Sequence, residues 1–311
     1  MSVDAGVDIG LVVRLENGSI ANPRIFVTRQ SQDTDLYLGV VDLSVAGDIV
    51  EVIDFGNDVS GLAVIDGLDF SVMPKLTKYP ATLPAWFRTL ERMHENKRIG
   101  TIPAWDLSRV ISFYGMFKGA SGLLSVSRWE FGSNADLTSM FEDADVSISG
   151  LGALDMSNVT SVLNMFKGAA ERAIADISDW CVPNVYGGQG LFTDLDWPAN
   201  LLPKWGTCRG VPVSPNSMRV ALADTSVVTD PAVIWHDDGN PSNRIVSPRW
   251  GYVAVIQWGN GLFNGIQANG FYSDVEDDYP DHLPSWLKIA SFRVSLETRY
   301  DLWDTSQIES F

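Results

Sequence analysis

A Met-Phe pair recurs through the middle of this chain at a nearly constant interval. It occurs at Met116-Phe117, Met140-Phe141 and Met165-Phe166, with a weaker copy at Phe192, so that the phenylalanines are 24, 25 and 26 residues apart. A second series keeps the same period, at Trp105, Trp129, Leu154, Trp180 and Trp205. A unit of this size is too small to bury its own apolar face, so equivalent large side chains must stack from one unit to the next. The repeat therefore predicts a solenoid with the Met-Phe series in its core, whereas the Trp series fits either the core or an exposed sugar-stacking face.

The two ends of the chain resemble each other. VIDFGN at 52–57 recurs as VIQWGN at 255–260, YPATLPAW at 79–86 as YPDHLPSW at 279–286, and AWDLSRVISF at 104–113 as LWDTSQIESF at 302–311. The offsets shrink smoothly through 203, 200 and 198, as a duplication with small deletions would give. We therefore expect two copies of one domain at 1–98 and 211–311, flanking a repeat domain at 99–210 of about 25 residues per unit.

Local patterns indicate that the end domains are β-rich. Short runs such as IFVTRQ, LYLGVVDLSV, DIVEVIDFG and AVIW are rich in β-branched and aromatic residues and end at Gly, Asn or Asp. The run HDDGN at 236–240 predicts a hairpin turn. One short helix is expected at 84–98, because Trp86, Leu90 and Met93 would share a face. The expected fold class is mainly β, with a central α/β leucine-rich-repeat-like solenoid flanked by a duplicated β-sandwich.

Composition excludes several classes of partner. The chain has 39 acidic and 22 basic side chains, a net charge of −17, which would repel a nucleic acid backbone. No apolar run is long enough for membrane insertion, and Asp4 and Asp8 stand where a signal peptide would be cationic, so we expect synthesis in the cytosol. Cys181 and Cys208 have no metal-ligand spacing, and in that compartment we expect unpaired thiols.

Few residues suggest chemistry. His94, His236 and His282 fall in no metal or catalytic motif, and no nucleotide-binding motif occurs, so we expect no enzyme and no cofactor. The acidic run at 274–281 offers hard oxygen ligands for calcium, but it lacks the EF-hand register and also fits a solvated loop. Its candidate ligands are Asp274, Glu276, Asp277 and Asp278.

The repeat units carry a family resemblance. WDLSRVISFYGMFKGAS at 105–121 and LDMSNVTSVLNMFKGAA at 154–170 resemble the repeats of BspA-like leucine-rich-repeat surface proteins, over about residues 99–208. VIDFGN and VIQWGNG resemble the DWGDG hairpin of PKD-like β-sandwiches, with Asn57 and Asn260 in place of the signature aspartates. The resemblance implies a non-catalytic, surface-exposed binding or structural module.

Our expectation for function joins this resemblance to the missing export signal. A tailed-phage virion protein of the tail or capsid decoration, made in the host cytoplasm, would be exposed without secretion. It would act by homo- or hetero-oligomeric assembly with other virion proteins and by contact with a host surface or surface glycan. The alternatives are a bacterial cell-surface adhesin or glycan-binding module and a glycoside hydrolase, although no carboxylate pair is singled out. Trp303 and Phe311 end the chain on an incomplete repeat, so we expect both to pack against another domain or subunit.

Overall fold

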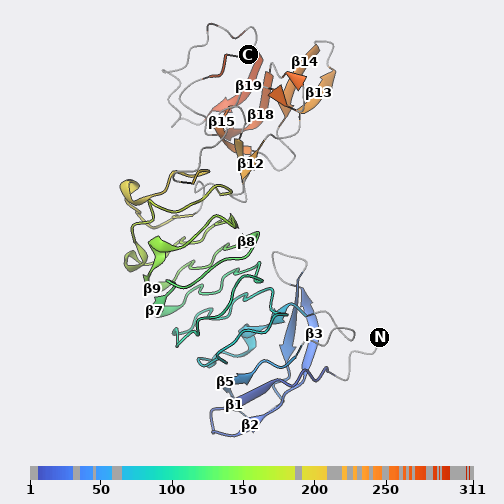
Figure 1. Cartoon of the computed structure of the whole chain (residues 1–311), viewed down its shortest axis with the longest axis vertical. Helices are drawn as coiled ribbons and strands as arrows, with labels where there is room; N and C mark the ends of the chain where they lie inside the picture. Colours follow the sequence, from blue (N-terminus) through green and yellow to red (C-terminus); the bar gives the residue numbers. More distant parts are fainter. Residues whose placement is uncertain are drawn as a thin grey trace. The chain divides into compact units, whose positions relative to one another are not determined.

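The structure is a computed structural model in which the chain is mainly β, built from small sheets and three-residue 3-10 helices (Figure 1). It describes residues 6–30, 36–44, 47–57, 65–185, 191–208, 219–222, 227–229, 233–237, 241–246, 252–258, 262–263, 266–267, 270–277, 283–285, 287, 289–294, 306 and 308. The expectation of a mainly β protein is confirmed. The chain forms two compact units: Met1–Cys181 with Gly188–Pro203, and Val182–Gly187 with Lys204–Phe311.

Two three-stranded sheets form the N-terminal part of the first unit. The first has the order β2-β1-β5 and is antiparallel, with β1 at Val12–Leu15, β2 at Ile20–Ala21 and β5 at Ile49–Asp54. The second has the order β3-β4-β6, with β3 at Ile25–Gln30, β4 at Tyr37–Val41 and β6 at Gly67–Leu68. The pair β4 and β6 is parallel, and the 3-10 helix η1 (Phe70–Val72) follows. The strands expected from the runs IFVTRQ, LYLGVVDLSV and DIVEVIDFG are confirmed.

The helix expected at 84–98 is wrong. These residues form turns, and Arg92 and Asn96 have φ angles of 53° and 56°, which an α-helix cannot contain. Alternate backbone N–H groups instead donate to carbonyls about 22 residues further along, from Leu90 to Ser112 at 3.0 Å and from His94 to Met116 at 2.7 Å. In such turns the buried apolar residues are three or four positions apart in the sequence, the same spacing as on one face of a helix. This shared spacing is why the sequence pattern predicted a helix.

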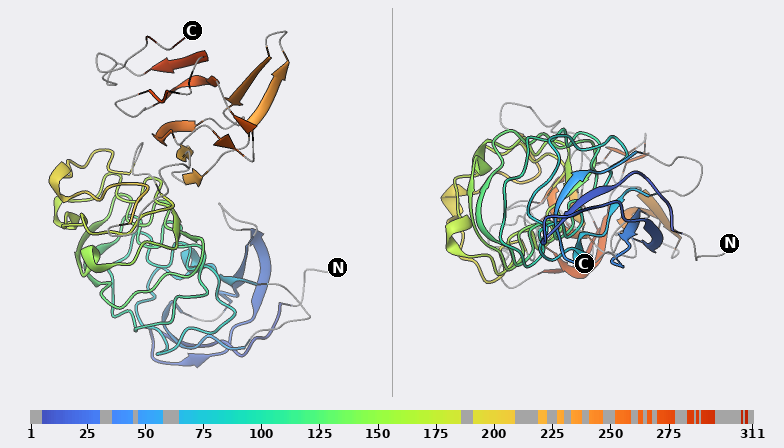
Figure 2. Two further views of the ribbon diagram at one scale, coloured as in Figure 1. Left: turned by 45° about the horizontal axis from the view of Figure 1, so that its top comes forward. Right: turned by 90° about the horizontal axis from the view of Figure 1, so that it is seen from below.

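Parallel pairing between residues one repeat apart builds the middle of the chain. Strand β7 (Ser121–Ser125) pairs with β9 (Asp145–Ser149), and β8 (Ala135–Asp136) pairs with β10 (Val159–Ser161), each in parallel. Isolated parallel bridges extend the pattern upstream to Thr89, which faces Ser112. The 3-10 helices η2 (Leu151–Ala153), η3 (Glu171–Ala173) and η4 (Ala199–Leu201) lie in the later turns. The right-hand view of Figure 2 looks nearly along the axis on which these turns follow one another, so that successive turns overlap in projection.

Left-handed residues recur at two positions in successive turns. One column has φ angles between 53° and 56° and comprises Arg92, Gly115, Ser139 and Asn164. The other has φ angles between 56° and 64° and comprises Asn96, Gly119, Asp143, Gly168 and Asp194. Its members are 23, 24, 25 and 26 residues apart, so each turn is one residue longer than the one before. Gly, Asn and Asp dominate because their small or locally hydrogen-bonding side chains tolerate this backbone conformation best.

The core of these turns is an aromatic stack. Phe117, Phe141 and Phe166 are buried, with successive ring centroids 5.4 Å apart and ring planes within 13° of each other. Met116, Met140 and Met165 are equally buried beside them. The prediction that the Met-Phe series lies in the core is therefore confirmed.

The second unit repeats the strand order found at the N-terminus. One sheet has the order β12-β11-β15, with β11 at Arg219–Leu222, β12 at Val227–Thr229 and β15 at Tyr252–Gln257, and corresponds to β2-β1-β5. The other has the order β13-β14-β18-β19, with β13 at Val233–Asp237, β14 at Pro241–Val246, β18 at Gly270–Asp277 and β19 at Ile289–Val294. A small hairpin pairs β16 (Leu262–Phe263) with β17 (Ile266–Gln267). β13 pairs antiparallel with β14, so the predicted hairpin is confirmed, but His236 and Asp237 belong to β13, and the rest of the turn predicted at 236–240 lies outside the described residues.

The correspondence between the two ends extends to irregular features. Register shifts occur at the same steps of the central strand, at Val12/Val13 and Arg14/Leu15 in β1 and at Arg219/Val220 and Ala221/Leu222 in β11. Each end also closes a turn at its Leu-Pro element, where Phe87 N–H donates to Pro84 at 3.1 Å and Leu287 N–H to Pro284 at 3.0 Å. Shared bulges and turns are details that unrelated sheets rarely have in common.

Candidate functional site

The tryptophan series of the repeats is buried as far as Trp180, whereas its last member, Trp205, is half-buried. Trp105, Trp129 and Trp180 are at most 7 % exposed, and Leu154 occupies the equivalent position at 6 %. Trp105 Nε1 donates to Pro80 O at 2.9 Å, and Trp180 Nε1 donates to Leu151 O at 2.8 Å. These rings therefore belong to the core and are not available to stack on sugars.

Many carboxylates of the repeats hold turns. Asp106, Asp155 and Asp176 each accept a hydrogen bond of 2.9–3.0 Å from the backbone N–H of the serine two residues later. The hydrogen bonds from these serines lower the pKa of Asp106 and of Asp176 below its ordinary value. Such Asx turns use the carboxylate as a structural cap. They explain the Asp-x-Ser pattern of the repeats without assigning it a role in catalysis.

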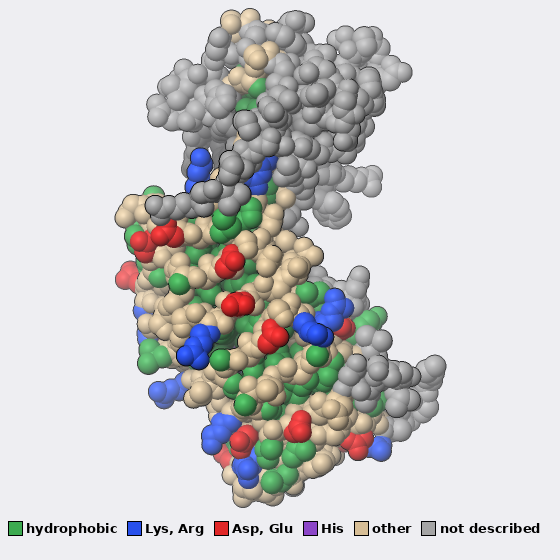
Figure 3. Space-filling view, in the orientation of Figure 1, with side chains coloured by type: hydrophobic (Ala, Val, Ile, Leu, Met, Phe, Trp, Pro, Cys, Tyr) green, Lys and Arg blue, Asp and Glu red, His purple; other side chains and the backbone are tan. Residues whose placement is uncertain are grey.

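Three charged residues, Lys118, Glu142 and Lys167, directly follow the stacked phenylalanines in the sequence. Lys118 Nζ lies 2.9 Å from Glu142 Oε2, and Lys167 Nζ lies 3.8 Å from Glu142 Oε1. Burial alone raises the pKa of Glu142, but hydrogen bonds from Lys118 and Ser139 outweigh it and lower that pKa. Acidic and basic side chains are interspersed on the visible face of the repeats (Figure 3).

Buried polar side chains gather where the N-terminal sheets meet the first repeat turn. Asp66, Asp69, Glu91, His94 and Lys97 are all at most 8 % exposed. Lys97 Nζ donates to Phe70 O at 3.0 Å and to Met93 O at 3.1 Å, and burial lowers its pKa to about 8. Sequence reasoning missed this cluster. The available signal was Met93-His94, which lies 23 residues before Met116-Phe117 and occupies the same place in its turn.

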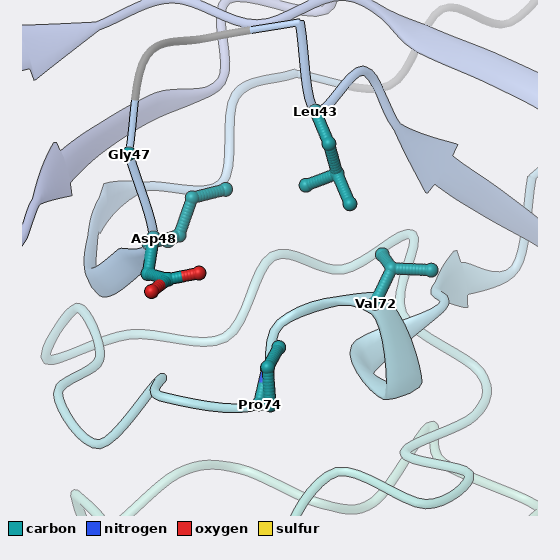
Figure 4. Close-up of a pocket in the computed structure, with 6 residues that line it drawn as sticks. Leu43, Gly47, Asp48, Val72 and Pro74 are labelled. Atoms are coloured by element: carbon teal, nitrogen blue, oxygen red, sulfur yellow. The ribbon is translucent and has the colours of Figure 1, made fainter.

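Among the described residues of the first unit lie two shallow surface hollows that we consider as binding sites. One, of about 280 Å³, lies among Leu43, Gly47, Asp48, Ile49, Val72 and Pro74 beside the N-terminal sheets (Figure 4). The other, of about 330 Å³, is lined by residues 100–102 and 123–125, including the 80 % exposed Leu123, together with Ser149. Neither contains a cluster of titratable groups.

The calcium candidates fall in the second unit. Asp274, Glu276 and Asp277 belong to strand β18, so the interpretation of this stretch as a solvated loop is wrong for these three residues. Asp278 lies outside the described residues, as do Trp303 and Phe311, so neither the acidic run as a whole nor the predicted interface is tested by the structure. Within the described part of the chain, no group of three or more His, Cys, Asp or Glu side chains could hold a metal ion.

The prediction of unpaired thiols is wrong, because both Cys181 and Cys208 are disulfide-bonded. Their separation of 27 residues is close to one repeat, a relation that spacing rules for metal sites do not consider. No helix in the described residues is both long and apolar enough to cross a membrane.

The segment with parallel turns and a stacked phenylalanine core is also the segment that resembles a known family. Residues 86–205 match the family described as Mycoplasma protein of unknown function, DUF285. This domain is found in BspA-like surface proteins, so the resemblance of the central repeats to that group is supported for this segment. No curated protein and no solved structure matches the chain.

Proposed function

We propose that this chain is a non-catalytic structural or adhesion protein that acts at a surface. Its central repeats would form a leucine-rich-repeat-like solenoid of the BspA type, flanked by two copies of a β-sandwich. The observation that carries the proposal is that the characteristic side chains of the repeats have structural roles. The aromatic residues form the core, and the carboxylates of Asp106, Asp155 and Asp176 cap turns. A repeat array of this kind offers an extended outer surface for partners.

The DUF285 match supports a cell-surface adhesin, because that domain is found in BspA-like surface proteins. The disulfide-bonded cysteines also favour an oxidising environment, such as a cell surface or a virion. The location outside the cytosol is thus supported by two independent features.

A virion component is the second candidate. The equal strand order and matching register shifts at the two ends support a duplication, which would present two equivalent attachment sites to a symmetric assembly. A tail or a capsid decoration would use such pseudo-symmetry.

Antibodies against the purified chain test both candidates. We expect them to label intact producing cells, if the chain is an adhesin, or particles purified by density gradient, if it is a virion component. Labelling that requires cell lysis, with the chain in the soluble fraction and absent from particles, would overturn the proposal. A matched antibody against a cytosolic protein controls for leakage.

A further inference from the structure

The aromatic stack of the repeats begins with an ionisable ring. His94 lies on Phe117 with ring centroids 5.5 Å apart and ring planes 12° apart, nearly the geometry that Phe117 has with Phe141. The rungs continue through Phe166 to Phe192 at 6.0 Å. Histidine thus takes the place that phenylalanine has in the following turns, and it is the one member of the described stack that can gain a proton.

The imidazole has no group to stabilise a charge. His94 is fully buried, and neither Nδ1 nor Nε2 has a hydrogen-bond partner within the described residues. Tyr79 packs edge-on against its other side with ring centroids 5.4 Å apart, and its hydroxyl is buried without a partner among the same residues. A buried cation without an acceptor is strongly disfavoured, so the neutral ring is preferred.

The positive charge of Lys97 adds to this preference. Lys97, three residues later in the same turn, is close enough that its positive charge disfavours a second positive charge on His94. Asp69 and Glu95 interact with the charge of Lys97, while Arg92 lies near Glu91 and Glu95 on the same turn as His94. From the neighbouring repeat the ring meets the apolar face of Phe117, and from the preceding segment it meets Tyr79.

We propose that His94 makes the first repeat turn an acid-sensitive element, in which uptake of a proton expels the imidazole from the stack and releases residues 84–98. The phenylalanine rungs cannot titrate, so the turns from Phe117 onward would persist. Two hydrogen bonds join this turn to the N-terminal segment: Arg88 N–H donates at 2.7 Å to the carbonyl of Asp66, the residue before β6, and Lys97 Nζ donates at 3.0 Å to Phe70 O in η1. The release would therefore loosen the N-terminal sheets from the repeats. Mild acid would then change which surfaces the chain presents.

The direction of the pH dependence follows from linkage. Burial, and secondarily the charge of Lys97, lowers the pKa of His94 to about 3. The opened state, with an ordinary pKa of about 6.5, binds more protons than the closed state at every pH between these values. The stability that His94 contributes is therefore complete above about pH 6.5 and is lost as the pH falls towards 3. Between pH 7.5 and 5.5 the opening equilibrium constant should rise about tenfold.

Hydrogen exchange measured by mass spectrometry on the full chain tests this proposal, with rates corrected for the intrinsic effect of pH. We expect the opening constant of peptides within 84–98 to rise about tenfold from pH 7.5 to 5.5, and that of peptides within 140–166 to stay unchanged. At pH 5.5 most carboxylates of ordinary pKa remain ionised, so histidine dominates the response.

Three variants separate the effect from general acid instability. H94F supplies the ring used by the other rungs and should abolish the response in 84–98. H94Q removes the titrating group without restoring the aromatic ring, so it should be less protected at both pH values but equally so. H282T, which introduces the residue that Thr82 provides at the equivalent place of the first copy, should keep the wild-type response. A tenfold response that survives in H94F or H94Q, or that disappears in H282T, would overturn the proposal, as would an equal response in 140–166.

Discussion

Replacing Gly119 by alanine measures how closely successive repeat turns approach each other. Gly119 has φ +63°, and a Cβ placed on it would lie 2.1 Å from Asn96 Oδ1 in the preceding turn. Gly115 is the matched control, because its φ is +56° while the nearest atom to its added Cβ is Arg92 Cγ at 3.6 Å. Both substitutions incur the left-handed backbone cost, but only one also incurs a clash.

The expected magnitudes follow from these two terms. G115A should lower the free energy of unfolding by about 1–2 kcal/mol, the cost of an alanine in the left-handed region. G119A should lower it by about 2–5 kcal/mol, because overpacking adds about 1–3 kcal/mol to the same backbone cost. The substitution N96G removes the clashing amide, and Asn96 already has φ 56°, a conformation that glycine adopts readily. In the double variant N96G/G119A the overpacking term should disappear while the backbone term stays.

Urea denaturation followed by tryptophan fluorescence gives the four free energies needed for this double-mutant cycle. The account predicts a coupling energy of about 1–3 kcal/mol between Asn96 and Gly119. Equal losses in G115A and G119A, or no rescue by N96G, would show that the Asn96 side chain simply moves aside and that the turns are not closely packed there.

Three further predictions concern charge, redox state and metal. E142Q should lower the free energy of unfolding at pH 7 by about 1 kcal/mol, and this difference should shrink as the pH falls, because the lowered carboxyl pKa makes the contribution of Glu142 fade in acid. Urea denaturation at pH 7 and at successively lower pH values checks this. In denaturant without reductant, iodoacetamide should modify neither Cys181 nor Cys208, and a mass increase of the unreduced chain would contradict the disulfide-bonded state. Reduction should lower the free energy of unfolding by about 2–4 kcal/mol. Millimolar calcium should leave Tm unchanged because the acidic run at 274–281 lacks an EF-hand register, and a rise of several degrees would show a site.

The sequence predicts the repeat core well, because large apolar side chains at a fixed period must stack to be buried. It misses the earliest turn for two physical reasons. His94 replaces the phenylalanine that marks the later turns, and Trp86, Leu90 and Met93 have a spacing that a helix and a tight left-handed turn share. The structure separates these options through the positive φ angles of Arg92 and Asn96.

The strands of the end segments were predictable from β-branched runs, whereas their pairing was not. The order β2-β1-β5 and its counterpart β12-β11-β15 depend on contacts between distant segments, which local propensity does not encode. The buried cluster around Lys97 could not be predicted for the same reason, since its partner Phe70 O lies 27 residues away. Asp278, Trp303 and Phe311 lie outside the described residues, so the predictions made for the calcium site and the interface stay predictions.

Excision of one repeat tests the proposed solenoid most directly. Deleting residues 117–140 joins Met116 to Phe141 and keeps the Met-Phe phase, whereas deleting only 117–128 joins Met116 to Trp129 and shifts every later turn by half a unit. Because each turn of a solenoid contacts only its neighbours, the account predicts that the first variant keeps a β-type circular dichroism spectrum and cooperative urea unfolding, and that the second loses both. Loss of folding in both variants, or equal tolerance of both, would contradict the stacked-repeat architecture.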